Sequence, residues 1–185
     1  MQVSMTKHFT VNASIQDVWA YMTDIEKVTQ SIPGAQYSEN LGNNNHSVTL
    51  TVKVGPIKSI YRSEISVKSL DEKSHRLEIE GKGVDTKGKG GANMEMVGQM
   101  VDNGNGSTEV TGNATVTIQG MLAQFGSRMI EDVSNQLFAQ FTDALCAKLE
   151  KNEDIDSNAT NTLSGTAVAG AAIKGITGRI RDKFK

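Results

Sequence analysis

Cysteine, proline and aromatic residues are scarce in this chain of 185 residues, and long hydrophobic runs are missing. The single cysteine, Cys146, excludes an internal disulfide framework and a cysteine-ligated metal cluster. No run reaches the length that crosses a bilayer, and the N-terminal segment MQVSMTKHFTV lacks the apolar core of a secretory signal. The net charge of −2 gives no general reason to expect nucleic acid or anionic lipid as a partner. These absences predict a cytoplasmic protein with one main domain.

The segment 120–149 gives the strongest secondary-structure signal. It contains no proline, and no glycine after Gly126. Its apolar residues recur at spacings of three and four, which places them on one face of a helix. They are Leu122, Phe125, Met129, Ile130, Val133, Leu137, Phe141, Leu145 and Leu149. The pattern predicts one long amphipathic helix of about 45 Å, at a rise of 1.5 Å per residue, whose apolar face must be covered by other elements.

Most of the chain before this helix alternates between apolar and polar residues, as β-strands do. Ser14 and Asp24 are expected to cap two short helices that follow the first strand. Short turns between consecutive strands predict antiparallel pairing. We therefore expect an α+β domain over residues 1–150, with a curved seven-stranded antiparallel sheet wrapped around the long helix. The expected strands cover residues 3–11, 35–41, 48–54, 57–70, 75–83, 92–100 and 110–118.

The composition changes after residue 150. Residues 151–164 are polar and predict a flexible linker. In residues 165–185, apolar residues again recur at three and four, and five basic residues oppose Asp182 alone, so this tail carries +4 and the rest of the chain −6. We expect the tail to lie on a membrane surface as an amphipathic helix, or else to dock on a partner protein or its own domain. The expected membrane-binding residues are Ile173, Lys174, Ile176, Arg179, Ile180, Arg181, Lys183, Phe184 and Lys185.

No motif in the chain predicts catalysis or metal binding. Residues 83–90 resemble a phosphate-binding loop, but Gly90 stands where a Ser or Thr is required, and strands are expected on both sides. A hairpin is therefore the better interpretation. Cys146 has no basic partner in the sequence, which predicts a structural thiol. The histidines have no metal-ligand spacing; they are His8, His46 and His75.

Methionine is the most informative residue type. Eight methionines occur, and several fall on the expected inner faces of the sheet and the helix. Flexible thioethers suit an adaptable apolar cavity, although they also fill ordinary cores. Small inner-face residues such as Gly98 and Gly112 leave further space, and an apolar cavity is a ligand site by default. The expected pocket residues are Val52, Val54, Tyr61, Ile65, Met94, Met96, Met100, Leu122, Phe125, Met129 and Val133.

Several short motifs resemble one protein family. They are Phe9-Thr10-Val11, Val18-Trp19, Asp24, Ile32-Pro33-Gly34-Ala35, Val54-Gly55-Pro56 and the segment GMLAQFG that begins at Gly120. Together with the order of elements, they make residues 1–150 similar to the CoxG family, named after the CoxG subunit of carbon monoxide dehydrogenase. This family lies within the START/Bet v 1-like (SRPBCC) superfamily, whose fold is the helix-grip.

The resemblance implies a non-catalytic accessory protein of a molybdenum-containing, carbon monoxide dehydrogenase-type enzyme. Such a protein would link the enzyme to the membrane and the respiratory chain from the inner face of the cytoplasmic membrane. The implied ligand is a quinone, menaquinone or ubiquinone, or a lipid, bound without a covalent link. Three alternatives stay open: a lipid carrier, a polyketide cyclase-like enzyme of the same fold, and a scaffold with a filled core that binds only proteins.

Overall fold

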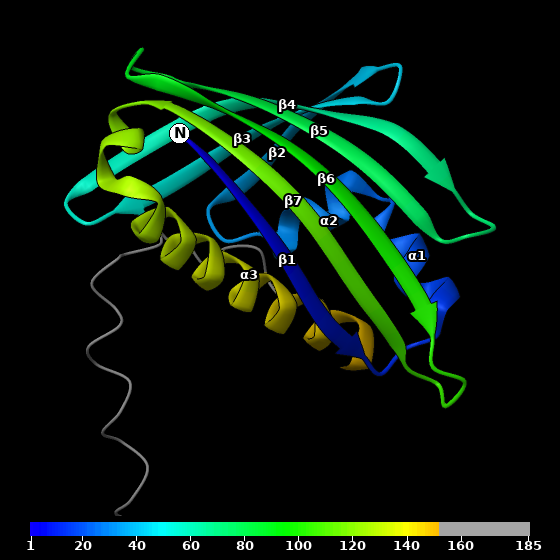
Figure 1. Cartoon of the computed structure of the whole chain (residues 1–185). Helices are drawn as coiled ribbons and strands as arrows, with labels where there is room; N and C mark the ends of the chain where they lie inside the picture. Colours follow the sequence, from blue (N-terminus) through cyan, green and yellow to red (C-terminus); the bar gives the residue numbers. More distant parts are fainter. Residues whose placement is uncertain (152–185) are drawn as a thin grey trace, which may run out of the picture.

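The computed structural model describes residues 1–151, which form a seven-stranded antiparallel sheet and four helical segments (Figure 1). Neighbouring strands follow the order β1-β7-β6-β5-β4-β3-β2. The predicted α+β meander is therefore confirmed. The elements are β1 (Gln2–Val11), α1 (Ile15–Met22), α2 (Ile25–Ser31), β2 (Ala35–Gly42), β3 (Asn45–Val54), β4 (Ile57–Asp71), β5 (Arg76–Asp85), β6 (Gly90–Asp102), β7 (Thr108–Gly120), the 3₁₀ helix η1 (Met121–Phe125) and α3 (Gly126–Lys151).

The two short helices begin at the predicted caps. The Ser14 hydroxyl accepts a hydrogen bond from the backbone N–H of Asp17 at 3.2 Å, and the Asp24 carboxylate accepts one from Lys27 at 3.1 Å. Each bond satisfies an N–H group that the first helical turn leaves without an intrahelical partner. The second helix ends just before Pro33, as the sequence predicted.

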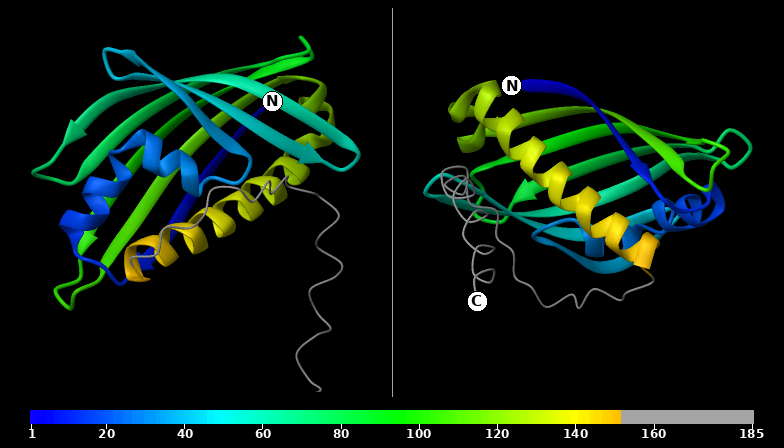
Figure 2. Two further views of the ribbon diagram at one scale, coloured as in Figure 1. Left: turned by 180° about the vertical axis from the view of Figure 1, so that it is seen from behind. Right: turned by 90° about the horizontal axis from the view of Figure 1, so that it is seen from below.

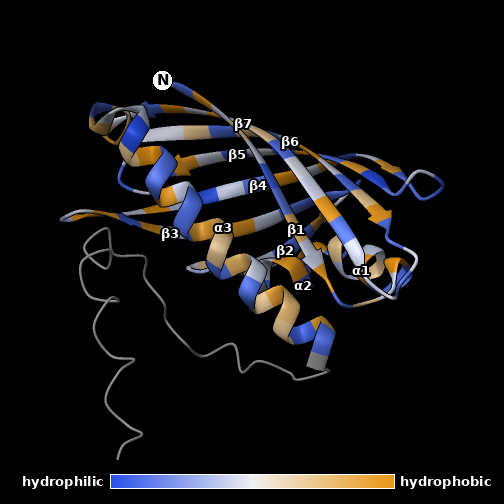
Figure 3. Ribbon diagram, turned by 60° about the horizontal axis from the view of Figure 1, so that its bottom comes forward, coloured by the Kyte–Doolittle hydropathy of each residue, from blue (hydrophilic) through white to orange (hydrophobic). Residues whose placement is uncertain are grey.

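Strand register divides the sheet into an inner face toward α3 and an outer face toward solvent. On β6, Met94, Met96 and Met100 share the inner face, and Met100 pairs with Val110 of β7. Register shifts in β2 and β4 interrupt the regular pairing. Such irregularities increase local bending and twist, which helps the sheet to curve around the helix. Hydrophobic and hydrophilic residues alternate along the strands and along α3 (Figure 3).

The C-terminal helix crosses the concave side of the sheet diagonally (Figure 2). It differs from the prediction in one respect, because residues 120–149 do not form one continuous helix. Gly120 and Gly126 have φ values of 82° and 79°, a left-handed conformation that interrupts helical geometry. A Cβ atom at Gly120 would lie 2.1 Å from the carbonyl oxygen of Lys89, so a side chain there is excluded. The chain therefore forms η1 first and begins the α-helix at Gly126.

Two clusters of buried apolar residues lie between the sheet and the helices. The first, which we call the proximal core, lies at the end of the sheet where β1 starts. It includes residues from the start of β1, the tips of β3 and β4, η1 and the first half of α3. The distal core gathers α1, α2 and the last half of α3. The proximal core consists of Val3, Val52, Val54, Tyr61, Ile118, Leu122, Ile130 and Val133. The distal core consists of Val11, Ile15, Val18, Met22, Ile25, Leu77, Ile79, Met100, Val110 and Leu145.

The domain boundaries after residue 150 stay a prediction. The helix α3 continues to Lys151, and residues 152–185, which include the predicted basic tail and nearly all of the predicted linker, lie outside the described part of the chain. Among the helices of residues 1–151, none has the length and apolar character needed to cross a membrane.

Candidate ligand-binding site

The predicted pocket residues fall mostly on the inner face, but they divide between the two cores. Six belong to the proximal core or pack against it, namely Val52, Val54, Tyr61, Leu122, Phe125 and Val133. Three belong to the distal core or pack against it, namely Ile65, Met96 and Met100. Met94 lies between the two groups, next to Gly81 and Ile65. Their role in ligand binding stays a prediction.

Met129 does not occupy the predicted inward position. It is 37% exposed, whereas Ile130 and Val133 are buried in the proximal core. Adjacent residues on an α-helix point about 100° apart. Because Ile130 takes the inward direction, Met129 turns toward solvent. The apolar pattern of the sequence could not decide between two neighbouring hydrophobic residues.

A band of small residues and one methionine separates the two cores on the inner face. Its members are Ser63 of β4, Gly81 and Gly83 of β5, Met94 of β6, and Gly112 and Ala114 of β7. We call these residues the middle band. They lie on adjacent strands. Gly83 pairs with Ser63, and Gly81 pairs with Met94. Ala114 pairs with Met96, which is two residues from Met94 on β6, so Met94 and Ala114 share a face. Neither core contains a buried member of the band.

One position of the middle band, Gly112, borders open space, whereas a Cβ atom at Gly81 or Gly83 would meet neighbouring side chains at 3.3 Å and 2.7 Å. A Cβ atom built at Gly112 would meet no other atom within 4 Å, although Gly112 faces the inner side. Met94, Ala114 and Ser63 are only half-buried. A solid core at close-packed density would surround these positions with side chains. The open space at Gly112 is therefore the candidate position for an apolar group of a ligand.

A polar corner adjoins the proximal end of the middle band. It consists of Ser59, Tyr61 and Asp85, which are 4%, 6% and 4% exposed, with Ser63 beside them. The Asp85 carboxylate accepts hydrogen bonds from the backbone N–H groups of Lys87 at 2.8 Å and Lys89 at 3.3 Å. This carboxylate therefore closes the β5–β6 turn, which explains why the residues that resembled a phosphate-binding loop form a hairpin.

The electrostatics of this corner keep Tyr61 protonated. Burial, followed by the negative charge of Asp85, raises the pKa of the Tyr61 phenol above its usual value, although the Ser59 hydroxyl opposes this. Burial also acts to raise the pKa of Asp85, but the backbone N–H groups of Lys87 and Lys89 and the Ser59 hydroxyl outweigh it, so the pKa falls below its usual value. A neutral phenol beside an ionised carboxylate can donate a hydrogen bond to a ligand at neutral pH.

Sequence reasoning missed Ser59 and Asp85 as parts of this corner. The available signal was the turn that begins at Asp85, because an Asp side chain often caps the backbone two residues further on. Among residues 1–151, no group of three or more His, Cys, Asp or Glu side chains is placed to hold a metal ion.

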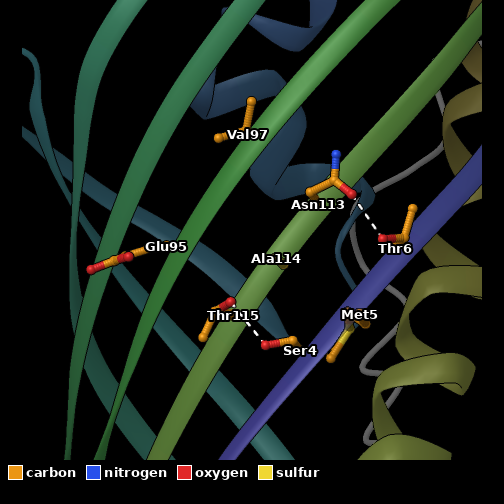
Figure 4. A pocket seen from close by; sticks show the side chains of 8 residues that line it. All are labelled: Ser4, Met5, Thr6, Glu95, Val97, Asn113, Ala114 and Thr115. Carbon is orange, nitrogen blue, oxygen red and sulfur yellow. Dashed lines mark hydrogen bonds between the residues drawn. The ribbon is translucent and has the colours of Figure 1, made fainter.

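Two grooves lie away from the predicted pocket. The larger, of about 410 Å³, is on the outer face across β1, β7 and β6 (Figure 4). Its hydroxyl and amide groups bond one another, with Ser4 3.1 Å from Thr115 and Thr6 donating to Asn113 at 2.8 Å. The smaller, of about 250 Å³, lies between β1 and α3 and includes Glu131. The smaller groove is lined mainly by polar groups, and the larger is an open groove that mixes apolar side chains with hydroxyl, amide and carboxylate groups, so both suit a hydrophobic ligand less well than an enclosed apolar site.

Comparisons with solved structures identify the fold. A conserved protein from Geobacillus kaustophilus superposes with a TM-score of 0.74 at 19% identity, over 82% of this chain and 98% of that chain. The Zhui aromatase/cyclase from Streptomyces sp. R1128 gives 0.60 at 14% identity, over 82% and 96%. A START superfamily protein from Mycobacterium smegmatis gives 0.57 at 16% identity, over 81% and 99%. The predicted START/Bet v 1-like helix-grip fold is thereby confirmed.

The sequence comparisons identify the family. No curated protein matches the chain. The family model for the CoxG subunit of carbon monoxide dehydrogenase matches residues 8–150, which is most of the described chain and includes β5, the middle band and both cores except Val3. The chain therefore belongs to the CoxG family of carbon monoxide dehydrogenase subunits.

Proposed function

We propose that the protein is a non-catalytic carrier that holds a hydrophobic ligand, a quinone of the menaquinone or ubiquinone type, between the sheet and α3. The observation that carries this proposal is the middle band, where Gly112 faces open space between two well-packed cores. In this role the protein would serve a carbon monoxide dehydrogenase-type molybdenum enzyme, in keeping with its family. It would pass electrons or quinone between that enzyme and the membrane.

The chemistry of the inner face supports an amphiphilic ligand. An isoprenoid chain would contact apolar side chains such as Met94, Met96 and Phe125. A quinone carbonyl accepts hydrogen bonds, and the protonated Tyr61 phenol, with Ser63 on the same inner face two residues along β4, can supply a donor. Ligand sites of this kind combine a mostly apolar lining with a few polar groups that fix orientation.

The test uses the full chain and two matched variants. Met96 and Val97 are neighbours on β6, but Met96 faces the inner side and Val97 the outer groove. Each protein is mixed with menaquinone or ubiquinone and purified again, and the quinone that stays bound is measured. Met96→Trp should lose the quinone, whereas Val97→Trp should retain it. If both variants and the wild type fail to retain any quinone or lipid, the carrier proposal is wrong.

A cyclase-like enzyme is the second candidate, because a buried Tyr61 lies near an ionised Asp85 and these are potential acid–base groups. The carboxylate, however, is engaged by the turn that it caps. Product formation from an aromatic polyketide analogue that Tyr61→Phe abolishes would favour the enzyme. Absence of turnover together with retained quinone would favour the carrier.

A further inference from the structure

The positive charges of the domain are unevenly distributed between its two ends. The β3–β4 and β5–β6 turns lie at the same end of the sheet as η1 and the N-terminus, and the other hairpin turns lie at the opposite end (Figure 1). Backbone hydrogen bonds tie this end together, from Met121 to Lys89 at 2.9 Å and from Thr86 to Ile60 at 2.8 Å. We call it the basic end, because it carries Lys53, Lys58, Lys87, Lys89 and Arg128.

None of the five cations of the basic end forms a salt bridge within residues 1–151, although Glu131 and Asp132 follow Arg128 within one turn of α3 and the charge of Lys89 helps to lower the pKa of Asp85. Within residues 1–151, every salt bridge involves other basic residues, namely Lys27, Lys68, Arg76 and Lys82. Lys53 and Lys58 even pair directly across the β3–β4 hairpin. Like charges opposite each other destabilise a hairpin, so this placement opposes folding. Asp85, the carboxylate of the β5–β6 turn, is 4% exposed and accepts hydrogen bonds from the backbone of its own turn.

The opposite end is mixed in charge and rich in carboxylates. Lysines occur there too, but Lys27 is paired with Asp24 at 3.2 Å. Exposed apolar residues occur at both ends, since Val84 and Met129 lie toward the basic end and Leu70 and Val101 toward the other. Charge, and not hydrophobicity, therefore distinguishes the two ends. The exposed acidic residues in the turns and helices of the opposite end are Asp17, Glu26, Asp71, Glu72 and Asp102.

The basic end also contains part of the predicted pocket. Val54 lies at the tip of β3, and Leu122 and Phe125 lie in η1; all three belong to the proximal core or pack against it. A hydrophobic ligand that moves between a bilayer and this site would have its shortest route through the basic end. Four of the five cations are lysines, whose compact charges on flexible stems can follow the mobile phosphates of a lipid surface.

We propose that the basic end of the folded domain is itself a docking surface for an anionic lipid bilayer, separate from the C-terminal tail, and that it holds the proximal core against the membrane during ligand transfer. The transfer role rests on the proposed function, whereas the docking role does not. Basic residues near an anionic leaflet each add about 1 kcal/mol of binding, an attraction that salt screens.

The experiment uses the full chain, with the tail intact in every sample. The basic-end variant replaces Lys53, Lys58, Lys87 and Lys89 with Gln. A charge-matched control replaces Lys27, Lys68, Lys73 and Lys148 with Gln, which removes the same number of charges elsewhere. Both are mixed with vesicles of equal parts phosphatidylcholine and phosphatidylglycerol, and with vesicles of phosphatidylcholine alone, and the bound fraction is measured by co-sedimentation.

The basic-end variant should bind the anionic vesicles at least about tenfold more weakly than the control variant. Equal binding by the two variants would overturn the proposal, whether both resemble the wild type or both are weakened. A basic-end variant that binds vesicles normally but no longer binds the dehydrogenase would also overturn the proposal. That result would assign the basic end to a protein partner. Quinone added in detergent to each purified variant reports on the carrier function separately, because that loading does not require docking on a membrane.

Discussion

The distal core and the proximal core lie under the same sheet and along the same helix, and the members of both are 0–8% exposed, yet different elements cover them. The distal core is covered by α1 and α2, and its Leu145 is 0% exposed. The proximal core is closed only by η1 and the start of α3, and its Leu122 is 6% exposed. The middle band lies between them. We therefore expect the distal half chiefly to stabilise the domain, and the ligand to lie at the middle band and beside the proximal core.

The largest expected effect separates the two cores directly. Leu145→Ala should lower the free energy of unfolding by about 2–5 kcal/mol, because truncation in a sealed core leaves a cavity. Leu122→Ala removes the same atoms from a core that is covered by the short η1 and should destabilise less, while weakening quinone retention more. Urea unfolding and quinone content measure the two effects. A larger stability loss for Leu122→Ala would contradict the division between the cores.

Truncation after Thr162 should have the next largest effect, on membrane binding and not on the fold. The removed residues 163–185 carry a net charge of +4 and an apolar stripe that includes Ile176 and Ile180. Loss of both should reduce binding to anionic vesicles by about tenfold or more, and added salt should weaken the binding that the full chain retains. The melting temperature serves as the control. Undiminished vesicle binding by the truncated chain would show that the tail is not the anchor.

A moderate effect is expected at the polar corner. Tyr61→Phe removes one hydrogen-bond donor and retains the ring. Because one hydrogen bond contributes about 0.5–1.5 kcal/mol, the affinity for quinone should fall about threefold to tenfold. A quinone titration followed by ligand absorbance would measure it. Ser66→Ala, also on β4 but hydrogen-bonded to Asn45, is the control. Equal affinity losses for the two variants would remove Tyr61 from the site.

The smallest effect is expected at Cys146. Burial, and then the charges of Glu150 and Asp143, raise the pKa of its thiol. The group is therefore protonated at neutral pH and a poor nucleophile. Cys146→Ala should leave quinone retention and vesicle binding within about twofold of the wild type, since the thiol makes only a weak contact with the Thr10 carbonyl at 3.9 Å. Loss of either function in a folded variant would contradict a structural role.

Patterns of local sequence predicted most of the fold. Apolar alternation fixed the inner faces of the strands, and the caps at Ser14 and Asp24 located the short helices. The same reasoning failed where tertiary context decides. Helical spacing gave no sign that Gly126 adopts a left-handed conformation, and it could not choose between Met129 and Ile130 for the inward position.

The site was predictable only in part, for a similar reason. Residue type and alternation place Met94 and Gly112 on the inner face, but only packing between distant elements shows which inner positions are filled. Asp85 was missed because its burial depends on the turn that it caps, and acidic residues are seldom buried without such partners.

The space in the middle band is where we expect the ligand, and one pair of variants tests this most directly. Gly112 and Gly98 both face the inner side and pair with each other across β6 and β7. A Cβ atom at Gly112 meets nothing within 4 Å, whereas one at Gly98 lies 3.2 Å from Leu77 of the distal core. Each glycine is replaced by Leu, and the melting temperature and the co-purifying quinone are measured.

We predict that Gly112→Leu keeps the wild-type melting temperature and loses quinone, because its side chain occupies the ligand's space. Gly98→Leu should instead lower stability, by the roughly 1–3 kcal/mol typical of overpacking. A Gly112→Leu variant that is destabilised as much as Gly98→Leu, with its quinone content unchanged, would contradict a ligand site in the middle band.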